Sequence, residues 1–120
     1  MPEGFTIMHL DEIERPWPKW SLARRSLGVE SFGMNVCHLE PGEDIPEHDE
    51  TERDQEEVFV VLHGSPAMVV DGEEHSLREG SFVRVDPERT RTVRNTGDES
   101  ASVLIVSAPR SSGYEPLGWA

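Results

Sequence analysis

The stretch that decides the fold runs from Gly42 to Gly64 and reads GEDIPEHDETERDQEEVFVVLHG. Five residues separate its first glycine from His48, and six residues separate Glu57 from its last glycine. A second stretch, GSFVRVDPERTRTVRN, runs from Gly80 to Asn95. Both contain short runs rich in Val, Phe or Thr between turn-forming residues, which is typical of β-strands joined by tight turns.

Beyond these two stretches, turn signals recur from Gly33 onward at intervals of about eight to twelve residues. This rhythm predicts an antiparallel sandwich or barrel with little helix. Asp71-Gly72 is the strongest hairpin signal, because glycine readily adopts the positive φ that a two-residue turn requires. The predicted strands cover residues 33–39, 56–63, 66–70, 73–77, 81–85, 90–95 and 101–107.

The two stretches resemble the two signature motifs of the cupin family, whose members are small β-barrels that usually hold a metal among three histidines and one glutamate. The resemblance implies an all-β chain, namely a cupin-type double-stranded β-helix or jelly-roll barrel. The barrel is expected over residues 31–108. A short N-terminal arm over residues 1–30 is expected to pack on the barrel or on a partner, and residues 109–120 are expected to form a C-terminal tail.

The chain departs from the family motifs at two metal-ligand positions. His48 and Glu57 stand at the family's first histidine and its glutamate, whereas Glu50 stands at the second histidine and Arg91 at the last. The resemblance therefore implies His48, Glu50 and Glu57 as the candidate metal ligands. Arg91 cannot join them, because a guanidinium stays protonated and has no lone pair to offer.

Two functions follow from this pattern, and the sequence leaves both open. In the first, the chain is a small-molecule-binding cupin with a metal-free pocket, in which Arg91 replaces the metal and bridges Glu57 and Glu50. In the second, it is a metal-dependent enzyme, such as a dioxygenase, isomerase or lyase, that holds Mn, Fe, Zn or Ni on His48 and the two glutamates. Arg91 would then anchor a small anionic substrate such as a carboxylate. A third possible role is a dimerisation module whose pocket has no ligand.

Strand parity predicts which side chains line the pocket. If Glu57 points into the barrel, Phe59, Val61 and His63 share its face, because alternate residues of a strand face opposite sides. Gln55 is a further candidate for hydrogen bonding to a ligand. The expected apolar walls are Met34, Val36, Phe59, Val61 and Phe82.

The opposite face of the same strand is apolar as well. Val58, Val60 and Leu62 occupy it. A strand with one face in water should alternate between apolar and polar residues, so this outer face is expected to be covered. A sheet-to-sheet homodimer is the simplest cover, and the N-terminal arm is the alternative.

The chain is strongly acidic, with 24 acidic and 11 basic side chains among 120 residues and a formal net charge of -13. Such a chain repels phosphate backbones and anionic lipid headgroups, which excludes nucleic acid and membranes as expected partners. Cys37 is the single cysteine, so an intrachain disulfide is excluded and a buried apolar role is predicted. The N-terminus lacks the pattern of a signal peptide, which predicts a cytoplasmic location.

All three tryptophans lie outside the predicted barrel. Trp17 and Trp20 are interpreted as arm residues that pack on the barrel exterior, with a lid or partner surface as the alternative. Residues 10–14 are expected to form one turn of helix. Because tryptophan is rarely left fully exposed, the tail is expected to dock. Its predicted anchors are Tyr114, Leu117 and Trp119.

Overall fold

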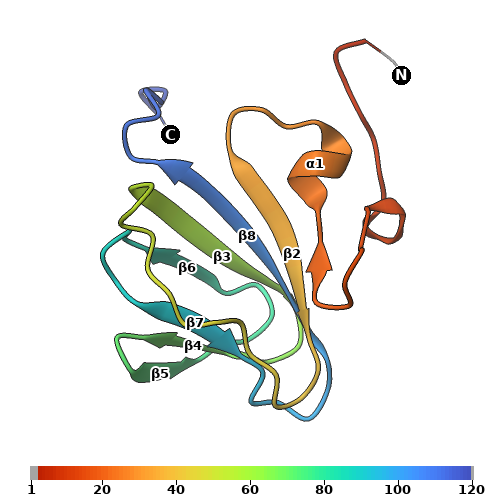
Figure 1. Ribbon diagram of the computed structural model, residues 1–120, viewed down its shortest axis with the longest axis vertical. Helices are drawn as coiled ribbons and strands as arrows, with labels where there is room; N and C mark the ends of the chain where they lie inside the picture. The colour runs from red at the N-terminus through yellow and green to blue at the C-terminus, as the bar shows by residue number, and fades with distance from the viewer. Residues whose placement is uncertain (1–2, 120) are drawn as a thin grey trace.

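Ten short elements follow one another along residues 3–119, the part of the chain that the computed structural model describes (Figure 1). They are the 3-10 turn η1 (Leu10–Glu12), β1 (Trp20–Ser21), α1 (Ala23–Leu27), β2 (Gly33–Leu39), β3 (Gln55–His63), β4 (Ala67–Val70), β5 (Glu73–Ser76), β6 (Phe82–Val85), β7 (Arg91–Arg94) and β8 (Ala101–Pro109).

The strands form two antiparallel sheets (Figure 1). The larger sheet has five strands in the order β1-β2-β8-β3-β6, and the smaller has three in the order β5-β4-β7. Phe59 and Val103 of the larger sheet share one apolar cluster with Met68 and Val93 of the smaller sheet, so the two inner faces enclose the core. This architecture confirms the predicted antiparallel all-β fold.

The long loop between β2 and β3 is attached to the smaller sheet by two isolated bridges. Asp44 pairs with Arg94, and His48 pairs with Arg91. These bridges continue the ladder beyond β7, because the His48 N–H donates to the Arg91 carbonyl and the Arg91 N–H donates to the His48 carbonyl. The backbone of the loop residue His48 is therefore hydrogen-bonded in the same way as that of a strand residue.

The seven predicted strands are all present, with ends that differ by one or two residues. Two elements of the N-terminal segment lie outside the sequence predictions. β1 pairs with β2 through Trp20 opposite Cys37 and Ser21 opposite Val36, and it extends the larger sheet by one strand. The short helix α1 then packs against β2 and ends at Gly28, which has a φ of 77°.

Two turns need the backbone freedom that their residues provide. Asp71 and Gly72 both have positive φ, 49° and 82°, and they connect β4 to β5 as the sequence predicts. Gly64 has a φ of 84°, and a Cβ atom there would lie 2.6 Å from the Ser100 carbonyl oxygen. Any larger residue at position 64 would clash with the backbone that enters β8.

Register separates an inner and an outer face of the larger sheet. Phe59 of β3 lies opposite Ile105 of β8, and both belong to the core cluster. Cys37 is also fully buried in this cluster, as predicted, and burial raises the pKa of its thiol to about 12. At pH 7 this thiol is protonated and behaves as a small apolar group.

Three parity predictions are wrong. Val36 pairs with Leu104 and therefore faces outward, although it is buried. Phe82 pairs with Val60 on the same outer face and is 73% exposed. The predicted inward facing of His63 fails because the register shifts after Val61, and the exposed His63 side chain instead pairs with Glu79 at 3.1 Å.

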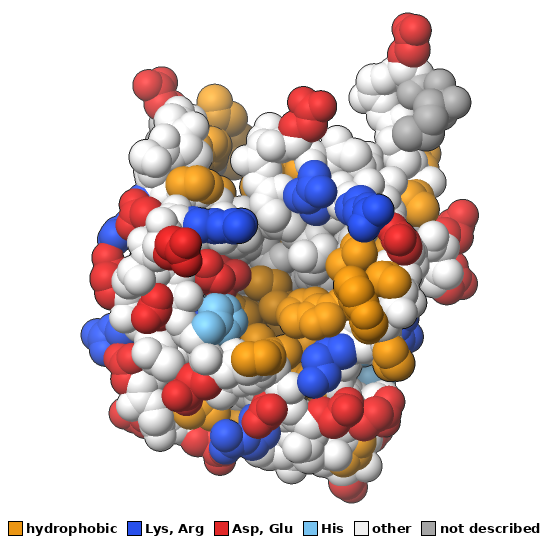
Figure 2. Space-filling view, in the orientation of Figure 1, with side chains coloured by type: hydrophobic (Ala, Val, Ile, Leu, Met, Phe, Trp, Pro, Cys, Tyr) orange, Lys and Arg blue, Asp and Glu red, His pale blue; other side chains and the backbone are white. Residues whose placement is uncertain are grey.

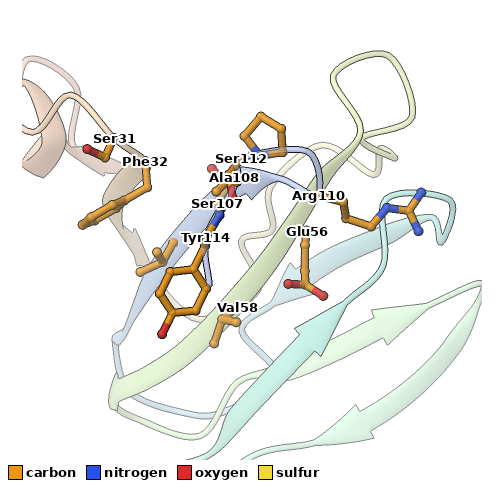
Figure 3. Close-up of a pocket in the computed structure, with 12 residues that line it drawn as sticks. Ser31, Phe32, Glu56, Val58, Ser107, Ala108, Arg110, Ser112 and Tyr114 are labelled. Carbon is orange, nitrogen blue, oxygen red and sulfur yellow. Dashed lines mark hydrogen bonds between the residues drawn. The ribbon is translucent and has the colours of Figure 1, made fainter. Parts of the chain in front are cut away.

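The outer face carries a groove of about 630 Å³ that lies beside the C-terminal tail (Figure 3). Phe32, Val58, Val106 and Tyr114 contribute apolar surface to it. Residues 3–119 leave this groove open. The predicted docking of the tail is wrong for the single chain, because Tyr114, Leu117 and Trp119 are all exposed. Within residues 3–119, no helix is long and apolar enough to cross a membrane.

Candidate functional site

A pocket of about 450 Å³ lies against the inner face of the larger sheet. Figure 2 shows a hollow in the molecular surface that is floored by hydrophobic side chains, with a histidine at its edge. The apolar wall of the pocket comprises Trp20, Met34, Ile45, Pro46, Phe59 and Ile105, and its polar wall comprises Asn35, His48, Glu50, Glu57 and Ser107.

A hydrogen bond to a backbone carbonyl orients the His48 ring. Its Nδ1 atom lies 2.8 Å from the Pro46 carbonyl oxygen. A carbonyl only accepts hydrogen bonds, so Nδ1 donates and the other ring nitrogen, Nε2, carries the lone pair in the neutral ring. That second nitrogen faces the two glutamates of the pocket.

Glu50 and Glu57 reach this nitrogen from two directions. Glu57 lies on β3 opposite Ser107 of β8, and its Oε1 atom lies 4.0 Å from His48 Nε2. Glu50 precedes β3, and its Oε1 atom lies 3.4 Å from the same nitrogen. The Glu50 backbone is fixed by donation of its N–H to the Pro87 carbonyl at 2.9 Å. One ligand atom from each of His48, Glu50 and Glu57 lies within 4.8 Å of the others.

The chemistry of these three residues fits a divalent first-row transition metal. Imidazole nitrogen and carboxylate oxygen are ordinary ligands of Zn, Mn, Fe and Ni. Three protein ligands would leave positions free for water or substrate. The three metal-ligand candidates predicted from the sequence are therefore brought together by the fold.

Glu57 is nine-tenths buried, and its Oε1 atom has no hydrogen-bond partner among the described residues. Burial raises the pKa of its carboxyl group above the usual value, because removal from water disfavours the charged form. The negative charge of Glu50 raises it further, whereas the positive charge of Arg91 opposes both effects. Glu57 thus depends on a nearby positive charge to stay ionised.

Arg91 is fully buried beside Glu57. Its Nη1 atom lies 3.8 Å from Glu57 Oε1, and its Nη2 atom donates to the Asp86 carbonyl at 2.7 Å. The Nε and Nη1 atoms have no hydrogen-bond partner among the described residues. Arg91 is not among the residues that line the pocket. The predicted bridge from Arg91 to Glu50 is absent: the guanidinium pairs with Glu57, and the Glu50 carboxylate lies 3.4 Å from His48 Nε2.

Comparison with a family model decides the family. Residues 35–107, more than half of the chain, match the Cupin_2 model, which is described as a cupin domain. The chain belongs to the cupin family. The matched region begins in β2 and ends in β8, so it contains both stretches on which the sequence resemblance rests.

Solved structures support the same cupin fold. A cupin protein from Bacteroides fragilis aligns with a TM-score of 0.80 at 20% identity, covering 98% of this chain and 94% of that one. A sugar phosphate isomerase of the cupin superfamily from Silicibacter pomeroyi gives 0.73 at 23% identity, covering 86% and 75%. A predicted oxalate decarboxylase from Thermotoga maritima gives 0.69 at 15% identity, covering 87% and 99%. At these identities the likeness concerns the fold alone. No curated protein matches the chain.

The other predicted pocket residues of this cupin are divided by the structure. Phe59 and Met34 line the pocket. Val61 is buried in the barrel opposite Val103, outside the pocket wall. Gln55 begins β3 opposite Pro109 and does not line the pocket either.

Six lining residues escaped the sequence predictions, namely Trp20, Asn35, Ile45, Pro46, Ile105 and Ser107. Ser107 and Asn35 lie at inward positions of their strands, and Ser107 is the direct register partner of Glu57. Parity on β8, counted from Ile105, would have found Ser107. Trp20 packs against the core cluster and lines the pocket from β1, and not on the barrel exterior as predicted. A two-residue strand has no periodicity from which Trp20 could have been predicted.

Proposed function

We propose that this cupin binds a small organic molecule in the pocket and has no resident metal. The position of Arg91 carries this proposal. The fully buried guanidinium lies 3.8 Å from the buried Glu57 oxygen and supplies the positive charge that Glu57 requires. In this role Arg91 stands at the position of the family's last ligand histidine, but it does not line the pocket.

Electrostatics disfavours a metal next to Arg91. Two like unit charges about 4 Å apart repel by about 4 kcal/mol at an effective dielectric constant of 20. A divalent ion bound to Glu57 would be repelled by the fixed charge of Arg91, which lies 3.8 Å from the Glu57 oxygen, is buried and cannot be withdrawn into water. Glu50 and Glu57 would offset part of the cost, so we expect weak rather than absent metal binding.

Elemental analysis tests this proposal. We expect the protein, purified without chelators, to contain first-row transition metal well below one ion per chain. The contrary result is one ion per chain that persists through dialysis against a chelator and disappears in Glu57→Ala. Glu56→Ala is the matched control, because Glu56 lines the groove on the outer face of the same strand.

A metal centre is the second candidate function, and the convergence of three ligand atoms within 4.8 Å favours it. His48, Glu50 and Glu57 would hold the ion, which would supply Lewis-acid chemistry to a metal-dependent dioxygenase, isomerase or lyase. With His48 neutral, the formal charges of Glu50, Glu57 and Arg91 sum to -1. One glutamate among three neutral histidines gives the same sum. Total charge alone therefore does not exclude a metal, and the elemental analysis decides between the two candidates.

We further propose that the outer face of the larger sheet forms a homodimer. Val58, Val60, Leu104 and Val106 form a half-buried apolar layer there, and Phe82 beside them is largely exposed. Two such faces packed together would remove this surface from water, as in other sheet-to-sheet interfaces. The single unpaired cysteine and the acidic surface agree with a cytoplasmic location, which stays a prediction.

Light scattering tests the dimer. We expect the wild type to have the mass of two 13.5 kDa chains. Phe82→Lys should weaken association at least ~10-fold, because it places a charge in the apolar interface. The side chain is 73% exposed in the single chain, so the monomer fold should not suffer. Phe82→Leu is the control and should remain dimeric. A wild type that stays monomeric at micromolar concentration contradicts the proposal.

A further inference from the structure

The converging polar groups of the pocket wall, on His48, Glu50 and Glu57, are hydrogen-bond acceptors, so a ligand that binds them must supply hydrogen-bond donors. His48 Nε2 faces Glu50 Oε1 at 3.4 Å and Glu57 Oε1 at 4.0 Å. Because His48 Nδ1 already donates to the Pro46 carbonyl, the neutral ring presents a lone pair to the two carboxylates. Three acceptors then face one small volume, and Glu57 Oε1 is buried without a hydrogen-bond partner. Such a group is costly to leave unsatisfied.

The charge of the pocket wall is negative. Among the described residues that line the pocket, Glu50 and Glu57 are acidic, and none is lysine or arginine. Arg91 cannot reach a ligand, since it is fully buried and lies outside the wall. A ligand carboxylate or phosphate would therefore face two carboxylates without a permanent cation in contact.

The rest of the pocket suits an apolar body of modest size. Trp20, Phe59 and Ile105 contribute apolar surface to this cavity of about 450 Å³. Cavities of this size bind small organic molecules, with most of the contact made by apolar side chains and orientation set by a few polar groups.

We propose that the pocket selects a primary alkyl or arylalkyl amine, whose ammonium group binds at His48, Glu50 and Glu57 and whose apolar body packs along Trp20, Phe59 and Ile105. An ammonium has three N–H donors and no acceptor, which matches three converging acceptors. Its single positive charge balances the formal charge of -1 that Glu50, Glu57 and Arg91 leave in the site. This inference rests on the proposed function, because a resident metal would occupy the same three acceptors.

A matched series of ligands tests the inference. Hexylamine, hexanol and hexanoate share an apolar body and differ in the head group. Each is titrated at pH 7 into full-length protein, and binding is followed by amide NMR shifts of β3 and β8. We expect hexylamine to shift the amides around Glu57 and Ser107 at a lower concentration than hexanol. Hexanoate should leave them unchanged.

Variants assign the effect to the site. Glu50→Gln should weaken hexylamine binding roughly 10- to 100-fold, the range expected for loss of one hydrogen bond to a charged group. Glu57→Gln should act in the same direction. Glu56→Gln removes the same charge from the outer face and should change nothing.

Each other outcome has a defined meaning. Preferential binding of hexanoate overturns the amine inference but leaves a small-molecule pocket in place. Equal binding of hexylamine by the wild type and by both glutamine variants also overturns it. Failure of hexylamine to bind metal-free wild type overturns it too. If that failure is accompanied by one tightly bound metal ion per purified chain, the proposed metal-free function fails as well.

Discussion

Replacing Arg91 with methionine is expected to lower the free energy of unfolding by about 3 kcal/mol at pH 7. The substitution leaves the Glu57 carboxylate buried without the cation that lies 3.8 Å away. It also removes the hydrogen bond from the guanidinium to the Asp86 carbonyl. Removing one partner of a buried pair costs more than the pair itself contributes, because the remaining charge has no compensation. Urea unfolding followed by circular dichroism measures the change.

A double-mutant cycle separates the charge effect from the loss of packing. Arg91→Met combined with Glu57→Gln should recover about 2 kcal/mol of the loss, because the uncompensated carboxylate is gone. Arg89→Met is the matched control. Arg89 pairs with Asp71 at the exposed surface, and its removal should change the free energy of unfolding far less than the removal of Arg91 does. If the double variant is no more stable than Arg91→Met alone, Arg91 does not compensate Glu57.

The loss caused by Arg91→Met should also depend on pH. The pKa of Glu57 is raised in the folded protein by burial and by Glu50, and Arg91 opposes this rise. Above the ordinary glutamate pKa of about 4.3, the folded state therefore binds more protons than the unfolded state, and stability falls as pH rises through that window. Without Arg91 the window extends to higher pH. The destabilisation by Arg91→Met should hence be smaller at pH 4 than at pH 7.

The second large effect concerns metal affinity. Arg91→His is expected to raise the affinity for Zn²⁺ by at least ~1000-fold, because two like unit charges repel by about 4 kcal/mol at this range and Zn²⁺ carries two charges. The substitution removes the buried guanidinium and restores the residue type that the family uses at this position. A histidine there would offer a ring nitrogen near Glu57, whereas arginine offers none. Arg91→His combined with Glu57→Ala serves as the control and should lose the gain.

The fold of this chain could be read from short-range signals. Asp71-Gly72 favours a hairpin, because its two residues can adopt the positive φ of a tight turn. The alternation of β3 places Glu57 and Phe59 on one face. Both signals lie within one short segment, so they can be interpreted without knowing which strands pair. The prediction from strand parity was wrong where the pairing of β3 with β8 is irregular. The register shift after Val61 turned His63 to solvent, and no residue in the sequence marks that shift.

The candidate site was predictable as a set of residues but not as an arrangement. The family pattern led to His48, Glu50 and Glu57, and the fold brings them together. The pattern could not show that Arg91 donates a hydrogen bond to the Asp86 carbonyl, because every residue has a backbone carbonyl and the sequence does not indicate which one is used. Trp20 was equally hidden, because its position depends on pairing of β1 with Cys37 of β2.

The most direct measurement is a calorimetric titration of Zn²⁺ into chelator-treated wild type and into Arg91→His, under the same conditions. If Arg91 supplies the charge that a metal supplies in other cupins, the wild type binds Zn²⁺ weakly and Arg91→His binds one ion per chain far more tightly. Tight binding of one ion by the wild type, with no gain in Arg91→His, would contradict this role and identify the pocket as a metal centre.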